Sequence, residues 1–128
     1  MSTATKAEEF VKEWYEAKGL SVVRVKRQET GFDFQTRDGT SYIEVKGTAA
    51  NKLSEVLFRY LTNSEYERIK WCLRNEKEYW LHLLTGVGSE GIKHYRIPGE
   101  FVLRNAKPEI SWMLPIRKNF ADFEVPDP

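Results

Sequence analysis

Two carboxylates and a lysine follow one another at short spacing: Asp33, ten residues, Glu44, one residue, and Lys46. Between them stands Asp38-Gly39, a strong signal for a two-residue hairpin turn. A turn there pairs Asp33 with Glu44 across two antiparallel strands, and carboxylates placed so close repel each other and raise one pKa. A divalent metal held by Asp33 and Glu44, with Lys46 beside it, would resolve the conflict. Mg²⁺ suits this arrangement because it takes one or two carboxylates and keeps several waters.

Alternation along the strands gives the predicted hairpin two different faces. The apolar face carries Phe32, Phe34, Ile43 and Val45, and the polar face carries Asp33, Gln35, Tyr42, Glu44 and Lys46. A second interpretation is an ordinary solvated strand face, on which these charges have no chemical role. The apolar alternate positions and the opposed carboxylates favour the metal site over that interpretation.

The pattern of Asp33, Glu44 and Lys46, within the strand sequence Tyr-Ile-Glu-Val-Lys-Gly, resembles the PD-(D/E)XK nuclease superfamily. It looks most like the Mrr-type restriction nucleases and the nuclease-like domains of unknown function attached to helicases and restriction proteins. Phe32 departs from the motif, because it stands where the motif has proline. The resemblance implies an α/β fold: a three-layer, restriction-endonuclease-like αβββαβ core with a mixed central sheet, over about residues 5–97.

The resemblance also implies an activity, that of a metal-dependent endonuclease hydrolysing DNA phosphodiester bonds in restriction or DNA repair. Asp33, Glu44 and the backbone carbonyl of Val45 would hold Mg²⁺ or Mn²⁺. Lys46 would position or activate the attacking water, or stabilise charge developing on the phosphorus oxygens. The implied partner is DNA, with a homodimer or a partner protein for cleavage of both strands.

A glutamate on the first helix supports the metal in many members of the superfamily. Glu8 matches this position best and Glu9 is second. Glu8 also has a purely structural interpretation, since Thr5-Lys-Ala-Glu8 reads as a capping box at the start of a helix.

Two rival functions remain open at this point. One is a non-catalytic module on the same fold that recruits nucleic acid or a partner protein. The other is an unrelated structural domain with a solvated hairpin. Degenerate members of the superfamily usually lose the aspartate or the lysine, and this chain keeps both, which favours the enzyme.

Size and composition indicate a single domain over residues 1–128, with a core over about 5–97 and a C-terminal extension over 98–128. Apolar residues make up 41% and aromatic residues 13%, enough for a hydrophobic core. The net charge of +1 is not that of a protein that coats nucleic acid. No apolar run approaches the roughly 18 residues of a membrane span and no signal-peptide core is visible, which predicts a cytoplasmic protein without membrane contact.

Hydrophobic periodicity predicts the remaining elements. They are a helix over 5–18, a strand over 20–27 in which Val23 and Val25 alternate with Arg24 and Lys26, a short strand or helix over 55–61, a helix opened by a Thr62–Glu65 capping box, a buried strand over 79–85 and a strand over 92–97.

Several other polar or reactive side chains have alternative interpretations. Cys72 is expected to be a buried thiol, His82 a core histidine, and His94 exposed and inert. Three basic residues are expected to be either solvated or in contact with phosphate: Arg24, Lys26 and Lys52. Glu29 is expected near the site. Glu65 is expected to cap a helix in preference to a role in the site. Phe120 and Phe123 are expected to dock on the body.

Overall fold

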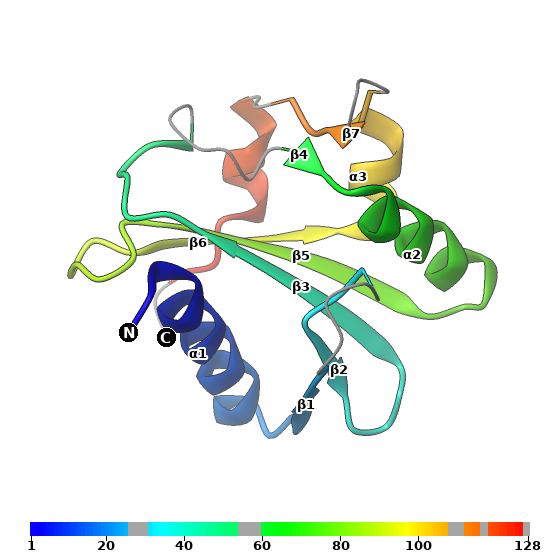
Figure 1. The fold of residues 1–128 in the computed structure, drawn as a ribbon, viewed down its shortest axis with the longest axis horizontal. Helices are drawn as coiled ribbons and strands as arrows, with labels where there is room; N and C mark the ends of the chain where they lie inside the picture. Colours follow the sequence, from blue (N-terminus) through cyan, green and yellow to red (C-terminus); the bar gives the residue numbers. More distant parts are fainter. Residues whose placement is uncertain (26–30, 54–59, 108–111, 116–117, 127–128) are drawn as a thin grey trace.

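The computed structural model describes residues 1–25, 31–53, 60–107, 112–115 and 118–126. A five-stranded sheet forms the centre (Figure 1), in the order β1 (Val22–Arg24), β2 (Phe34–Thr36), β3 (Ser41–Gly47), β5 (Glu78–Thr85) and β6 (Lys93–Pro98). β3 and β5 run parallel and every other neighbouring pair is antiparallel. The strand predicted over 79–85 is therefore central, as its apolar sequence indicated.

Helices cover both faces of the sheet, which gives three layers (Figure 1). α1 (Thr3–Ala17) lies on one face, and α2 (Asn63–Arg74) and α3 (Gly99–Asn105) lie on the other. On the same side as α2, β4 (Tyr60–Leu61) pairs with β7 (Trp112–Met113), followed by the 3₁₀ helix η3 (Lys118–Phe123). The predicted α/β architecture is confirmed. Of the segment 55–61, only the two residues of β4 belong to the described part of the chain.

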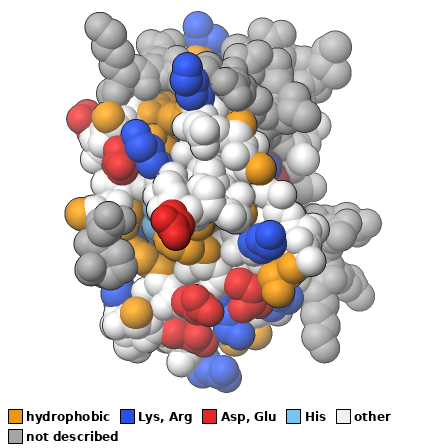
Figure 2. Space-filling model, turned by 90° about the vertical axis from the view of Figure 1, so that its left-hand side faces the viewer, with side chains coloured by type: hydrophobic (Ala, Val, Ile, Leu, Met, Phe, Trp, Pro, Cys, Tyr) orange, Lys and Arg blue, Asp and Glu red, His pale blue; other side chains and the backbone are white. Residues whose placement is uncertain are grey.

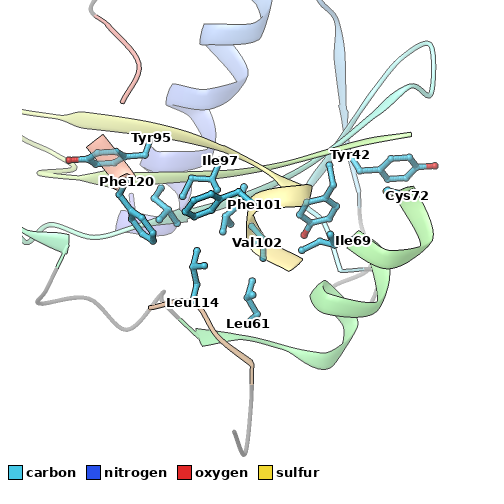
Figure 3. Close-up of a cluster of buried hydrophobic side chains, with 13 residues drawn as sticks. Tyr42, Leu61, Ile69, Cys72, Tyr95, Ile97, Phe101, Val102, Leu114 and Phe120 are labelled. Atoms are coloured by element: carbon cyan, nitrogen blue, oxygen red, sulfur yellow. The ribbon is translucent and has the colours of Figure 1, made fainter. Parts of the chain in front are cut away.

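Each face of the sheet has its own hydrophobic core. The core under α1 contains Ala7, Val11, Tyr15, Val22, Phe34, Ile43, Val45, Leu84 and Val87. The core under α2 and α3, shown in Figure 3, includes Tyr42, Leu61, Ile69, Cys72, Tyr79, Leu81, Ile97, Phe101, Val102, Leu114 and Phe120. β3 therefore contributes alternate residues to opposite cores, as its pleat requires.

The two long helices begin differently from each other. The hydroxyl of Ser2 accepts the backbone N–H of Thr5, so α1 begins at Thr3 and the capping box predicted from Thr5 to Glu8 is wrong. An N-cap three residues earlier leaves Glu8 beyond the first turn and free of any capping role. The capping box predicted at α2 is confirmed, because the Thr62 hydroxyl accepts the Glu65 N–H and Glu65 accepts the Thr62 N–H.

The predicted facing of the first strand is wrong. Val22 is buried, whereas Val23 is 44% exposed. The register explains this, because Val22 pairs with Thr36 and Arg24 pairs with Phe34, whose ring lies in the core under α1. Directly paired residues share a face, so Val22 and Arg24 point to that core and Val23 points away.

The C-terminal residues pack on the body and extend the core under α2 and α3. Phe120 is buried and Phe123 packs against the same cluster, so their predicted docking is confirmed. The rings of Phe101 and Phe123 meet edge to face with centroids 4.7 Å apart. No helix in the described residues is long and apolar enough to cross a membrane.

Candidate active site

The hairpin that carries the predicted site has the expected register. Phe34 pairs with Ile43 and Gln35 with Tyr42. The connection is nevertheless four residues long, because β2 ends at Thr36 and β3 begins at Ser41. The Asp38 carboxylate stabilises this wider loop by accepting hydrogen bonds from the Thr36 hydroxyl at 2.8 Å and from the Thr40 N–H at 3.1 Å. The predicted two-residue turn is therefore wrong, whereas the predicted register is confirmed for these two pairs. The direct pairing predicted for Asp33 and Glu44 is not formed, because β2 begins at Phe34 and the Asp33 N–H bonds to Ile43 instead.

Asp33 directly precedes β2, and both its backbone and its side chain form hydrogen bonds with β3. Its backbone N–H donates to the carbonyl of Ile43 at 2.7 Å. Its carboxylate Oδ2 accepts the backbone N–H of Val45 at 2.8 Å. The carboxylate is thereby held against the middle of β3, next to Glu44.

The backbone leading to Asp33 is clamped from two sides. The Tyr79 hydroxyl, from β5, donates to the carbonyl of Gly31 at 2.6 Å. Gly31 has a φ of +83°, and a Cβ there would lie 2.3 Å from the carbonyl oxygen of Ser64 on α2. Only glycine allows this conformation and this approach, so Asp33 is tied to both β5 and α2.

Phe32 does not lie on the face predicted for it. Its ring meets Tyr42 edge to face, with centroids 4.7 Å apart, and packs on the α2 side of the sheet. Phe34 lies on the opposite side, in the core under α1. The strict alternation fails because Phe32 precedes the regular strand, which begins at Phe34.

Glu44 and Lys46 point from β3 toward the start of α2. The Lys46 Nζ lies 3.8 Å from Glu44 Oε2 and donates a hydrogen bond of 3.0 Å to Glu65 Oε2. The Glu44 and Glu65 side chains are each 10% exposed and that of Lys46 is 15% exposed. Asp33, Glu44, Lys46 and Glu65 therefore form one partly buried charged cluster, called here the acidic cluster.

The acidic cluster holds more negative charge than its one lysine balances. Burial raises the pKa of Glu44 well above its usual range, the charges of Asp33 and Glu65 raise it further, and Lys46 opposes them. Burial also raises the pKa of Asp33, against the hydrogen bond from Val45. A bound cation would favour the ionised forms of both carboxylates.

Glu8 lies close enough to the cluster for its charge to raise the pKa of Asp33. Its carboxylate forms an ion pair with Arg24 on β1, and Glu9 lies 3.9 Å from the same guanidinium. The Arg24 guanidinium also lies 4.9 Å from the centre of the Phe34 ring. Arg24, which was expected to be solvated or to contact phosphate, therefore links α1 to the hairpin.

The donor set fits a magnesium-like ion better than a soft metal. Mg²⁺ takes one or two carboxylates and completes its shell with water and substrate phosphate oxygens. Asp33 and Glu44 supply two carboxylates side by side, and Val45 brings its backbone to the same place. Among the described residues, no group of three or more His, Cys, Asp or Glu side chains is arranged to hold a metal ion.

The structure also bears on three of the other residues that the sequence singled out. Cys72 is fully buried and burial raises the pKa of its thiol to about 11, so the structural interpretation is confirmed. Lys52 is exposed in the loop after β3. Lys26 and Glu29 lie outside the described residues.

His94 is buried, so its predicted exposure is wrong. His82 forms two hydrogen bonds of 2.7 Å. Its Nδ1 atom bonds to Nε2 of His94, and its Nε2 atom bonds to the Tyr15 hydroxyl. These three residues are called the histidine chain. β6 pairs with β5 so that His94 stands opposite Leu84, and Phe10 and Trp14 of α1 cover its ring. The strand predicted over 92–97 gave no sign of a cover over His94, but Phe10 and Trp14 of α1 pack on its ring.

The architecture defines the fold class of the protein. The architecture is that of the restriction-endonuclease-like, or nuclease-like, fold. It is similar to the structure of Hjc, a Holliday junction resolvase from the hyperthermophilic archaeon Archaeoglobus fulgidus, with a TM-score of 0.63 and 17% identity over 97% of this chain and 91% of that chain. At this level of identity the similarity concerns the fold alone.

The sequence also identifies a family. The family model described as Protein NO VEIN, C-terminal, matches residues 5–97, and the chain belongs to this family. No curated protein matches the sequence. The matched residues run from α1 to β6 and include the whole acidic cluster.

Proposed function

We propose that this protein is a metal-dependent endonuclease that hydrolyses DNA phosphodiester bonds at the acidic cluster. The observation that carries the proposal is the pair Asp33 and Glu44, two carboxylates with raised pKa values beside the partly buried ammonium of Lys46. Such pairs destabilise the fold unless a cation or a substrate uses them. Strongly perturbed carboxylates are therefore candidates for a functional site.

Each residue has a defined role in this proposal. Asp33, Glu44 and the carbonyl of Val45 would hold Mg²⁺ or Mn²⁺. Such an ion, when bound, polarises the phosphate and lowers the pKa of a bound water. The backbone N–H of Val45 holds Asp33 in place through Oδ2, which leaves its second carboxylate oxygen as a ligand. Glu8 would support the ion through water, with Arg24 fixing its position.

Lys46 would supply the positive charge that the reaction needs. As phosphodiester hydrolysis proceeds, negative charge builds up on the phosphorus oxygens, and a preorganised ammonium stabilises it. A partly buried lysine does this better than a solvated one, because little water has to reorganise around it. The same ammonium could instead orient the attacking water by hydrogen bonding.

DNA is proposed as the substrate because the fold is shared with a protein named as a Holliday junction resolvase. The net charge of +1 gives no general attraction to nucleic acid. Acidic and basic side chains are interspersed on the face shown in Figure 2. DNA binding would therefore depend on local contacts near the site. Cleavage of both strands would need a second copy or a partner protein, in restriction or repair.

A plasmid-nicking assay tests the proposal. Supercoiled plasmid should be converted to the open circular form in Mg²⁺ or Mn²⁺ and should stay intact when a chelator replaces the metal. Glu44→Gln, purified in the same way, should not nick, which controls for a contaminating nuclease. Absence of metal-dependent nicking by the wild type, with DNA binding retained, would instead identify a non-catalytic binding module.

A further inference from the structure

Glu65 uses its two carboxylate oxygens for two different partners. Oε1 accepts the backbone N–H of Thr62 at 3.0 Å, which closes the capping box of α2. Oε2 accepts the Lys46 ammonium, also at 3.0 Å. A capping box needs only the first of these contacts. The second contact therefore requires a separate explanation.

The ammonium of Lys46 lies closer to Glu65 than to Glu44. Its Nζ is 3.0 Å from Glu65 Oε2 but 3.8 Å from Glu44 Oε2. A lysine side chain is a flexible four-carbon stem with a point charge at its end, so its position depends on its partners. Within the acidic cluster, Glu65 is the carboxylate that makes the short contact.

Glu65 is also well placed to be rigid. It is 7% exposed and stands in the first turn of α2, where the partial positive charge of the helix terminus favours a carboxylate. One residue before it, Ser64 packs its carbonyl against Gly31, on the backbone that leads to Asp33. The start of α2 thus touches both the lysine and the loop of the aspartate.

We infer that Glu65 is a positioning residue, which anchors the ammonium of Lys46 so that α2 sets where this charge stands in the site. The inference rests on the proposed function of Lys46. Glu65 acts through Lys46 and has no contact of its own with the scissile phosphate. Removing the Glu65–Lys46 contact should therefore lower the rate of cleavage and leave the binding of DNA unchanged.

Glu65→Gln separates the two contacts of this side chain. Glutamine keeps an oxygen that accepts the Thr62 N–H, so the capping box survives. Its amide nitrogen is a donor and cannot accept from the ammonium. We expect kcat to fall at least tenfold with KM for DNA unchanged. In the Lys46→Ala background, Glu65→Gln should cause no further loss, since the partner through which it acts is gone.

Thr62→Ala is the matched control for stability. It removes the hydroxyl that caps α2 but leaves both contacts of the Glu65 carboxylate, because the Thr62 N–H remains. We expect a lower melting temperature and an unchanged kcat. A loss of kcat equal to that of Glu65→Gln would overturn the inference and assign the effect to helix stability. A further loss from Glu65→Gln in the Lys46→Ala background would do the same.

A measurement without DNA or metal keeps the inference separate from the proposed function. The rate at which acetic anhydride labels Lys46, followed by peptide mass spectrometry, should rise several-fold in Glu65→Gln relative to Lys70, whose side chain is 37% exposed. Unchanged labelling of Lys46 overturns the inference whatever the activity. Absence of nicking by the wild type overturns the proposed function instead, so the two failures are distinguishable.

Discussion

The two faces of strands β3 and β5 both bury polar side chains, but of opposite kinds. On the α2 face, the acidic cluster places three carboxylates around one ammonium. On the α1 face, the histidine chain joins Tyr15, His82 and His94 through two hydrogen bonds of 2.7 Å. Val45 pairs with His82, and Glu44 pairs with Leu81. The two networks therefore lie at adjacent residue pairs of the parallel strands β3 and β5.

The difference between the networks is one of charge. Burial lowers the pKa of His82 well below its usual range and that of His94 to about 4, and it raises the pKa of Tyr15 to about 12. The histidine chain is therefore neutral near pH 7, with its polar atoms paired, as a stable interior requires. The acidic cluster instead keeps carboxylates whose pKa values are raised by burial and by each other. The first network stabilises the fold, whereas the second is maintained at a cost that a bound cation would relieve.

Replacing Lys46 should give the largest effect and tests the acidic cluster directly. Lys46→Ala removes the ammonium but keeps all three carboxylates. If the ammonium acts on the transition state, nicking should slow by about 100-fold or more, roughly 2.7 kcal/mol of activation free energy. DNA affinity should change little, because one phosphate contact is a small part of a multi-contact electrostatic interaction. Nicking rate and binding constant should be measured on one DNA at one salt concentration.

Lys70→Ala is the matched control for the charge change. Lys70 lies on α2 with its side chain 37% exposed, and its ammonium is 3.3 Å from Glu67, which belongs to neither network. It should nick at the wild-type rate. Wild-type nicking by Lys46→Ala would show that the activity belongs to a contaminant or to another site.

Lowering the pH should change the free energy of unfolding in opposite directions through the two networks. The folded pKa of His94, about 4, lies below its ordinary 6.5, so the unfolded chain binds the extra proton as the pH falls. Unfolding then becomes easier, by about 2 kcal/mol from His94 alone between pH 7 and pH 5. His82 contributes with the same sign. The raised pKa values of Asp33 and Glu44 work the other way, because the folded chain takes up their protons first and gains stability as the pH falls through these values.

Glu44→Gln separates these two contributions to the pH dependence. This variant should be more stable than the wild type at pH 7, where the buried charge is lost. Its free energy of unfolding should also fall more between pH 7 and pH 5. The variant lacks the proton uptake by Glu44 that partly offsets the destabilisation from His82 and His94. Urea unfolding at pH 5, 6 and 7 measures both effects. Identical pH dependence in the two proteins would mean that Glu44 does not oppose the histidine chain.

Local patterns were enough to predict most of the architecture. The central strand, the register of the hairpin and the capping box of α2 follow from apolar runs, turn residues and cap residues, which act over a few positions. Two local predictions, the turn at Asp38-Gly39 and the capping box from Thr5 to Glu8, were wrong by a few positions. Two other errors came from contacts that are distant in sequence. Val23 is exposed because pairing with β2, not the short alternation, sets the facing of β1. His94 is buried because Phe10 and Trp14 of α1, at the other end of the described core in sequence, cover it.

The site was predictable only in part, for the same reason. Asp33, Glu44 and Lys46 belong to one hairpin, so spacing and alternation indicated that they meet. The contact between Lys46 and Glu65 joins a strand to a helix, and the sequence pattern around Glu65 already had a local explanation as a cap. A residue that has one sufficient local role gives no signal of a second. The pairing of Glu8 with Arg24 was hidden similarly by an apparent capping box.

The smallest expected effect concerns metal binding. It tests whether a cation stabilises the acidic cluster, in contrast to the histidine chain, which is neutral and hydrogen-bonded. Asn in place of Asp33 can still accept the Val45 N–H through its side-chain oxygen, but it removes one negative charge. Without metal, Asp33→Asn should be as stable as the wild type or more stable. With Mn²⁺ at ten times its Kd, the wild type should gain about 1.4 kcal/mol and the variant clearly less. Asp38→Asn, on the same hairpin but exposed in its turn, should keep the full gain. Thermal melts of the three proteins with and without Mn²⁺ decide the matter: a wild type that Mn²⁺ does not stabilise, or an Asp33→Asn variant stabilised equally, would contradict a metal site at Asp33.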